Sequence, residues 1–250
     1  MRKLTVLSFL MATSFSLLGS IGFAAESADV RKVDILFVID NSGSMTISQS
    51  DLKQNLSNFI NTLDKNVVKM AITTTDAFYG QQFLDVGCSL CNVNQTKFRN
   101  SIEVGVNGSG DERAFSSFKA ALESPLNTDF HRPNAYLSVI IVSDADDFSH
   151  DTMSLDESYT QPTLHPVEKY ASFLANFTSG KPKKDFSVST IGVLDSECRD
   201  QLAGSGENKI GLRYMKLSKL TGGVQGSICS PISTNLEKIS QAIRTESALR

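Results

Sequence analysis

The sequence lacks any concentration of positive charge. Its 250 residues include 24 Lys and Arg against 27 Asp and Glu, and the formal net charge is −3. A mildly acidic chain without a basic block is a poor candidate for binding nucleic acid. Internal repeats and low-complexity segments are absent as well. A chain of 250 residues is long enough for one α/β domain with a sizeable core.

The residues and motifs that hydrolases use are also scarce. The three histidines, His131, His150 and His165, are scattered without the spacing of metal ligands. No G-x-S-x-G nucleophile elbow and no phosphate-binding Gly loop with Lys occurs. The residue two positions after Asp40 is Ser42, where aspartyl-phosphate phosphatases carry a second Asp. A metal-dependent hydrolase that activates water is therefore kept only as an alternative function.

The N-terminal segment has the pattern of an export signal. Arg2 and Lys3 precede a charge-free run over residues 4–23, and small residues up to Ala24 suit a signal peptidase. Cleavage after Ala24 removes two cations and no acid, so the net charge falls from −3 to −5. We expect residues 1–24 to be a signal peptide and the mature protein to be secreted or periplasmic, in a bacterial envelope. Because the apolar run is long for a cleaved signal, retention as a membrane anchor is the competing interpretation.

Four cysteines fit an oxidising compartment. Cys198 and Cys229 bracket a polar, Gly-rich stretch and a helix, and we expect them to form a structural disulfide. Cys88 and Cys91 form a C-x-x-C at what reads as a loop tip, where a local disulfide is the favoured interpretation. A redox motif or half of a zinc site are the alternatives. A redox motif should lie at the start of a helix that follows a strand, and a zinc site needs two more soft ligands nearby.

Apolar runs alternate with amphipathic stretches of helical period along residues 30–246. This order predicts a single domain with a doubly wound, mostly parallel six-stranded sheet, one antiparallel edge strand and helices on both faces. The expected strands are Val33–Ile39, Val67–Thr73, Gln81–Val86, Leu137–Ser143, Phe186–Val193 and Val224–Ile228. The capping boxes Ser48-x-x-Asp51 and Thr234-x-x-Glu237 are expected to begin the first and last helices.

Side-chain oxygens follow the ends of two predicted central strands. Asp40, Ser42 and Ser44 lie on the loop after the first strand, and Asp144 directly follows the strand that ends at Ser143. Open α/β sheets build their ligand sites at the carboxyl ends of the strands. Burying carboxylates there without a counter-ion would be costly, and a divalent cation removes that cost. Hydroxyl and carboxylate oxygens suit Mg²⁺, Mn²⁺ or Ca²⁺ better than zinc. The alternative without a metal is that residues 40–44 form only a strand-to-helix turn, because Asp, Asn, Ser and Gly are common in turns.

Further acids lie on two loops. Asp111 and Glu112 precede the helix expected around Phe115, and Asp146 and Asp147 follow Asp144. The latter two are open to three interpretations: partners of the metal ligands, a separate Ca²⁺ site, or solvated loop charges. The last is slightly favoured.

In element order, residues 30–245 resemble the von Willebrand factor A-type domain and its metal-ion-dependent adhesion site, which is also found in integrin I domains. The resemblance rests on Asp40-x-Ser42-x-Ser44, an acidic second loop, and Asp144 after an apolar strand. It implies that Ser42 and Ser44 bind the metal directly and that Asp40 and Asp144 hold it mostly through waters. One coordination position would stay open for the Asp or Glu of a protein partner.

The second loop departs from the family, which usually places a Thr ligand there. Here Asp111 takes that position, or Glu112 if the register shifts by one residue. A third carboxylate would lower the positive charge left on the metal and favour Ca²⁺ or Mn²⁺, although Mg²⁺ is the first expectation. The pattern is similar to that of a secreted bacterial subset of the family.

The leading hypothesis is therefore an exported, non-enzymatic, metal-dependent binding or adhesion module. A surface-assembly scaffold with a vestigial metal site is the second alternative beside the hydrolase. A membrane association is expected only if the N-terminal run is retained.

Overall fold

A computed structural model describes most of the chain beyond the N-terminal segment. The described residues are 31–63, 67–76, 100–151, 162–178, 185–204, 206 and 208–248. The signal segment, the C-x-x-C of Cys88 and Cys91, and the edge strand expected at Gln81–Val86 lie outside them. Those three expectations therefore stay predictions.

The described strands form one five-stranded sheet in the order β2-β1-β3-β4-β5, and every pairing in it is parallel. The strands are β1 (Val33–Ile39), β2 (Val68–Thr74), β3 (Tyr136–Val142), β4 (Phe186–Gly192) and β5 (Gln225–Ser227). Each coincides with an expected strand to within one residue at either end. In the register of β1 and β3, Ile39 pairs with Val142, so the loops after these strands begin side by side.

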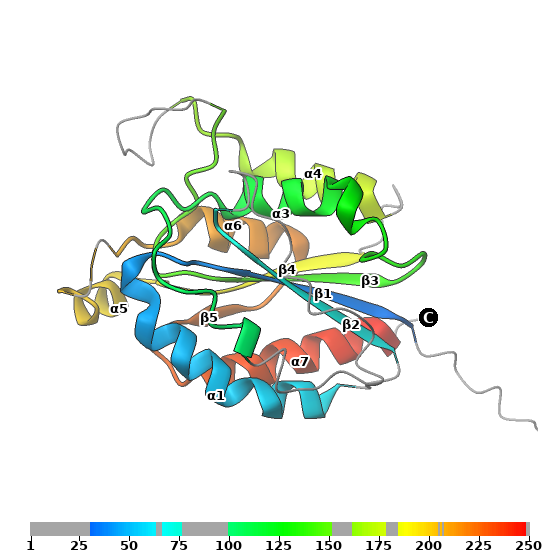
Figure 1. Cartoon of the computed structure of the whole chain (residues 1–250), viewed down its shortest axis with the longest axis horizontal. Helices are drawn as coiled ribbons and strands as arrows, with labels where there is room; N and C mark the ends of the chain where they lie inside the picture. Colours follow the sequence, from blue (N-terminus) through cyan, green and yellow to red (C-terminus); the bar gives the residue numbers. More distant parts are fainter. Residues whose placement is uncertain are drawn as a thin grey trace, which may run out of the picture.

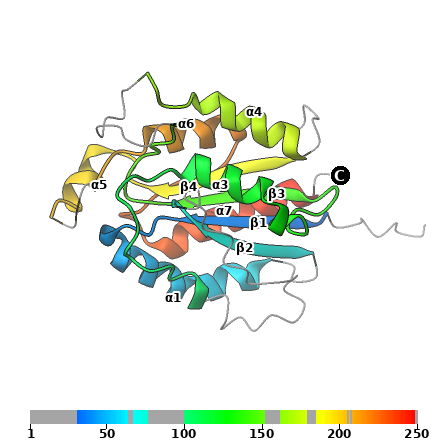
Figure 2. The same ribbon diagram turned by 45° about the horizontal axis from the view of Figure 1, so that its top comes forward.

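Helices cover both faces of the sheet (Figure 1). On one face lie α1 (Thr46–Thr62) and α7 (Ile232–Ala248), and on the other lie α3 (Ala114–Glu123), α4 (Val167–Thr178) and α6 (Leu212–Thr221). The turned view in Figure 2 shows the short α5 (Ser196–Gln201) beyond one end of the strands. This arrangement is a doubly wound α/β architecture with the carboxyl ends of the strands toward α5.

The central strand β1 is apolar on both faces, as expected of a strand between two helical layers. Phe37 and Ile39 belong to the core cluster that includes residues of α1 and α7. Leu36 and Val38 belong to the second cluster, with residues of α3, α4 and α6. The buried sheet fixes where β1 and β3 end, and hence where their loops begin.

Both expected capping boxes are wrong. A 3₁₀ turn at Gly43–Met45 leads directly into α1 at Thr46, so Ser48 and Asp51 lie inside the helix. Helix α7 begins at Ile232, and the backbone N–H of Thr234 donates to the carbonyl of Pro231 as part of the first turn. Helix α1 begins earlier than expected because the 3₁₀ turn before it already has helical geometry. Helix α7 begins two residues before Thr234, directly after Pro231.

The short α5 was not expected from the sequence. Asp195 caps it by accepting a hydrogen bond from the backbone N–H of Cys198 (2.8 Å). The Cys198–Cys229 disulfide is present and joins α5 to the turn that precedes α7, with a Cα–Cα distance of 5.6 Å. None of the described helices is both long enough and apolar enough to cross a membrane.

Candidate metal centre

The loop after β1 is held by the Asp40 carboxylate. One of its oxygens accepts a hydrogen bond from the backbone N–H of Ser42 (2.8 Å), and the other accepts from the hydroxyl of Ser143 (2.7 Å). Asp40 itself is fully buried. This arrangement curls the loop so that the Ser42 and Ser44 hydroxyl oxygens lie 3.2 Å apart.

The loop after β3 reaches the same place. The Ser44 hydroxyl donates to a carboxylate oxygen of Asp144 at 3.1 Å, and Asp144 is 3 % exposed. Asp40, Ser42, Ser44 and Asp144 therefore form one cluster, which we call the oxygen cluster. The adjacency of β1 and β3 brings these four predicted residues together across 100 positions of sequence.

Neither carboxylate of the oxygen cluster has a cationic partner among the described residues. Burial raises the pKa of Asp40 above its ordinary value, although hydrogen bonds from Ser143 and Ser42 oppose this. Burial, together with the negative charge of Asp40, raises the pKa of Asp144 to about 6. By contrast, buried Asp34 and Asp147 pair with Arg132 and Arg213.

This donor set fits a hard divalent cation. It offers two carboxylates and two hydroxyls, all oxygen, and no thiolate or imidazole in the described part of the chain contacts it. A cation there would supply the positive charge that both acids lack. The described residues contain no cluster of three or more His, Cys, Asp or Glu side chains arranged to hold a metal, so two serine hydroxyls would have to complete the set.

The second loop lies against the first through its backbone. The N–H of Gly108 donates to the carbonyl of Asn41 at 2.7 Å. A Cβ at position 108 would lie 2.4 Å from the end of the Asn41 side chain, so Asn41 would have to move and give up its hydrogen bonds with Asp76 and Thr75. The glycine thus lets the two loops approach closely while Asn41 keeps these bonds.

The acids of the second loop have partners of their own. The Asp111 carboxylate accepts hydrogen bonds from the guanidinium of Arg113 and lies 3.8 Å from Nε2 of His150. Glu112 is 3 % exposed, and its backbone carbonyl accepts from the N–H of Phe148 at 2.7 Å. Which of the two acids takes the third ligand position stays a prediction.

Two residues at the site were missed by sequence reasoning. Gln49 in α1 is buried, and its side-chain amide donates to the carbonyls of Asp40 and Gly105, both at 2.8 Å. Asp76 follows β2, and one of its carboxylate oxygens accepts from Asn41 Nδ2 (3.1 Å) and from the N–H of Ser109 (2.9 Å). Both tie the second loop to the first. The position of Asp76 just past a strand end was the available signal.

The favoured interpretation of Asp146 and Asp147 as solvated charges is wrong. They are 3 % and 0 % exposed, and both make hydrogen bonds to groups distant in sequence. Their partners lie in α3 and α6, whose packing against this loop the sequence did not reveal.

The fold is similar to that of von Willebrand factor A-type domains, and the oxygen cluster lies where the loops after β1 and β3 meet. No family model matches the sequence, and no curated protein matches it. Similarity is found among solved structures. Two of proximal thread matrix protein 1 from the mussel byssus superpose with TM-scores of 0.54 and 0.51, at 13 % and 15 % sequence identity. The structure with the TM-score of 0.51 has a zinc-occupied MIDAS motif, where MIDAS stands for metal-ion-dependent adhesion site.

These matches cover 84 % and 89 % of this chain but only 47 % and 46 % of the mussel protein. The chain thus spans about half the length of the structures it resembles. A third structure, human COPII-coat protein Sec24c, has a TM-score of 0.48 at 11 % identity, covering 87 % of this chain and 32 % of its own. At such identities the likeness establishes the fold alone.

Proposed function

We propose that this chain is an exported, cation-dependent protein-binding module. The observation that carries the proposal is the pair of buried carboxylates, Asp40 and Asp144, which have no cationic side chain among the described residues. They are linked through the loop of Ser42 and Ser44: Asp40 accepts from the backbone N–H of Ser42, the two serine hydroxyls are in contact, and the Ser44 hydroxyl donates to Asp144. A divalent cation, with Mg²⁺ first and Mn²⁺ or Ca²⁺ as alternatives, is bound there through Ser42 and Ser44. The fold of the mussel protein and its zinc-occupied motif support this assignment.

The cation keeps one coordination position for an Asp or Glu of a protein partner. A carboxylate ligand from outside would complete an oxygen shell of the kind that such cations prefer. Export is supported by the charge-free N-terminal run and by the Cys198–Cys229 disulfide, which suits an oxidising compartment. The non-enzymatic role is part of the same proposal, and a panel of phosphoester and peptide substrates with Mg²⁺ and Mn²⁺ tests it.

The cation site is tested by titrating Mn²⁺ into the protein in a calorimeter. The variant with Ser42→Ala and Ser44→Ala removes both hydroxyls but neither carboxylate, and we expect its affinity to fall by at least tenfold. Ser57→Ala, on the same polypeptide segment but within α1, is the matched control and should bind as the wild type does. Equal Mn²⁺ affinity in all three proteins would refute the proposal.

The third ligand position is resolved by a pair of variants. Asp111→Asn and Glu112→Gln each remove one charge from the second loop, and only the variant that loses a ligand should show weaker Mn²⁺ binding.

The partner's contribution is tested with immobilised, Mn²⁺-loaded protein. The retention of peptides that carry Asp or Glu is compared with that of the same peptides carrying Asn or Gln. If the acidic peptides and their Asn or Gln counterparts were retained equally, or if the acidic peptides stayed bound in a chelator, binding of the acid through the metal would be contradicted.

A further inference from the structure

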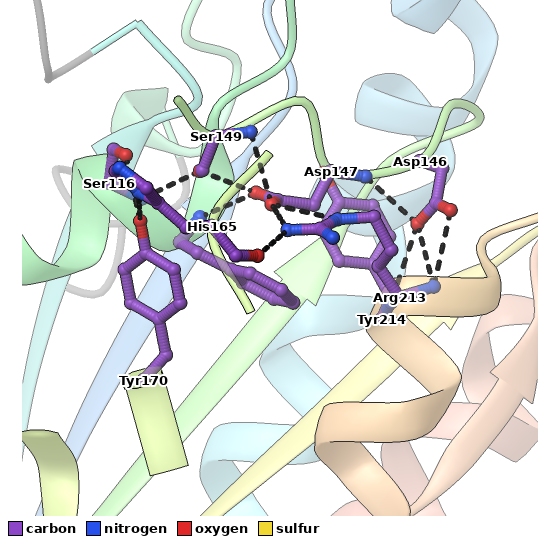
Figure 3. A network of polar contacts seen from close by, with 9 residues as sticks. Ser116, Asp146, Asp147, Ser149, His165, Tyr170, Arg213 and Tyr214 are labelled. Atoms are coloured by element: carbon purple, nitrogen blue, oxygen red, sulfur yellow. Dashed lines mark hydrogen bonds and ion pairs between the residues drawn. The ribbon is translucent and has the colours of Figure 1, made fainter. Parts of the chain in front are cut away.

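The loop that carries Asp144 continues into a network of buried polar contacts (Figure 3). The backbone N–H groups of Ala145, Asp147, Phe148 and Ser149 all donate hydrogen bonds. The remaining residue of this segment, Asp146, accepts hydrogen bonds with its carboxylate. Among the described residues of this loop, Ser143 and Asp144 are the ones that bond the first metal loop directly. The contacts of residues 145–149 therefore anchor the segment that directly follows Asp144.

Asp147 is the centre of the network. One of its carboxylate oxygens accepts from the backbone N–H of Phe115, at the start of α3 (2.9 Å), and from the Ser149 hydroxyl (2.8 Å). The other accepts from the Arg213 guanidinium (3.1 and 3.3 Å) and from the N–H of Ser149 (3.1 Å). The side chain is fully buried, so a single fixed acid bonds to two helices and to its own loop.

Arg213, in the first turn of α6, joins this loop in two ways. Its guanidinium pairs with Asp147 and also donates to the carbonyl of His165 at 2.7 Å. Its backbone N–H donates to the carboxylate of Asp146 (3.0 and 3.1 Å), which caps the start of α6. Removing the guanidinium would leave Asp147 as a buried charge without its counter-ion.

The same segment also holds the second loop in place. The N–H of Phe148 donates to the backbone carbonyl of Glu112, and the Ser149 hydroxyl accepts from the N–H of Ser116 at 2.9 Å. Arg113 donates to the carbonyl of His150 at 3.4 Å. The loop after β3, here called the third loop, is thus bonded to Glu112, Arg113 and Ser116, at and just after the position where a third metal ligand is expected.

We propose that the ion pair of buried Asp147 and partly buried Arg213 sets the relative position of the second and third loops, so that Asp147 and Arg213 are positioning residues for cation binding. This inference rests on the proposed function, since it assigns to that site its supporting residues. Neither side chain bonds the oxygen cluster. They act by holding Asp144 and the Asp111–Glu112 segment in register before the cation arrives.

A second buried ion pair provides the matched control. Asp34, in β1 at the amino edge of the sheet, is fully buried and accepts from the Nε and the backbone N–H of Arg132, both at 2.7 Å. Asp40 lies at the other end of the same strand. The two pairs have the same chemistry and similar burial but lie at opposite edges of the sheet, and only one contacts the metal loops.

The test measures Mn²⁺ affinity by calorimetry on Arg213→Lys, Arg213→Met and Arg132→Lys. Lysine keeps the buried charge but loses the planar fork that reaches both Asp147 and the His165 carbonyl. Loss of such supporting contacts typically weakens metal binding by about 10- to 100-fold. We expect the Met variant to lose at least tenfold in affinity, the Lys variant to be intermediate, and Arg132→Lys to bind as the wild type does.

Hydrogen exchange on the metal-free proteins gives a readout that does not depend on the cation. The backbone N–H groups of Asp147 and Ser149 should exchange faster in Arg213→Lys than in Arg132→Lys. If Arg213→Met does not fold, the Lys pair still decides the question. Equal Mn²⁺ affinity in Arg213→Lys and Arg132→Lys would overturn the positioning role alone. A wild-type protein that binds no Mn²⁺ would overturn the proposed function and this inference together.

Discussion

Replacing a predicted metal ligand should stabilise the metal-free protein. Asp144 is 3 % exposed, and burial with the nearby charge of Asp40 raises its pKa to about 6 from an ordinary 3.8. The folded state therefore holds the Asp144 proton more tightly than the unfolded state does. Stability from this group is fully present below the ordinary pKa and is lost as the pH rises through about 6.

The size of the effect comes from the two pKa values. Each pKa unit corresponds to about 1.4 kcal/mol, so ionised Asp144 lowers the free energy of unfolding by at most about 3 kcal/mol above its folded pKa. Asp144→Asn removes the charge and keeps an oxygen that can accept from Ser44. In a chelator, near pH 7.5, the Asn variant should be more stable than the wild type by up to about 3 kcal/mol. Near pH 4.5 the difference should shrink to about 1 kcal/mol.

Urea denaturation at these two pH values, with and without Mn²⁺, measures both quantities. Comparing variant with wild type cancels the titration of Asp40, Asp146 and Asp147 to first order. Added Mn²⁺ should reverse the order at the higher pH, because only the wild type keeps the complete donor set and gains stability by binding the ion. A metal-free Asn variant that is less stable than the wild type near pH 7.5 would refute the reasoning.

Two further outcomes are expected. Gly206 has φ +135°, and a Cβ there would lie 2.9 Å from Cβ of Ser44, whereas Gly204 has φ +104° and open space around it. Both Gly→Ala variants should lose about 1 kcal/mol of stability through backbone strain. Only Gly206→Ala should weaken Mn²⁺ binding in the calorimeter. Equal Mn²⁺ affinities of the two variants would contradict a role for the contact between position 206 and Ser44. Replacing Cys198 and Cys229 by Ser opens a loop with a sequence separation of 31. This should lower the urea-derived free energy of unfolding by about 3–4 kcal/mol in the chain-entropy model, and an unchanged urea midpoint would contradict it.

The sheet and the first metal loop could be read from the sequence because each depends on local pattern. Strands β1 and β3 are short apolar runs, and their ends place Asp40 and Asp144 whatever the rest of the chain does. Only the adjacency of the two strands had to be assumed, and the register confirms it. The sixth strand, at Gln81–Val86, falls outside the described residues and stays a prediction.

The supporting residues could not be read in this way because their partners are distant in sequence. Asp147 looks like a loop charge until Phe115 and Arg213 are packed against it, 32 and 66 residues away. Buried Gln49 likewise looks like an ordinary polar residue of a helix until its bond to Gly105, 56 residues away, is seen. Such contacts depend on helix packing, which the hydrophobic pattern indicates only in outline.

The central claim is that one cation is held by the serines and acids of the loops after β1 and β3. Anomalous diffraction at the manganese edge from crystals grown with Mn²⁺ tests it most directly. The claim predicts an anomalous peak about 2.1–2.3 Å from the hydroxyl oxygens of both Ser42 and Ser44, beside the carboxylates of Asp40 and Asp144. A crystal with no peak there, or with its strongest peak elsewhere, for example between Asp111 and His150, would contradict it.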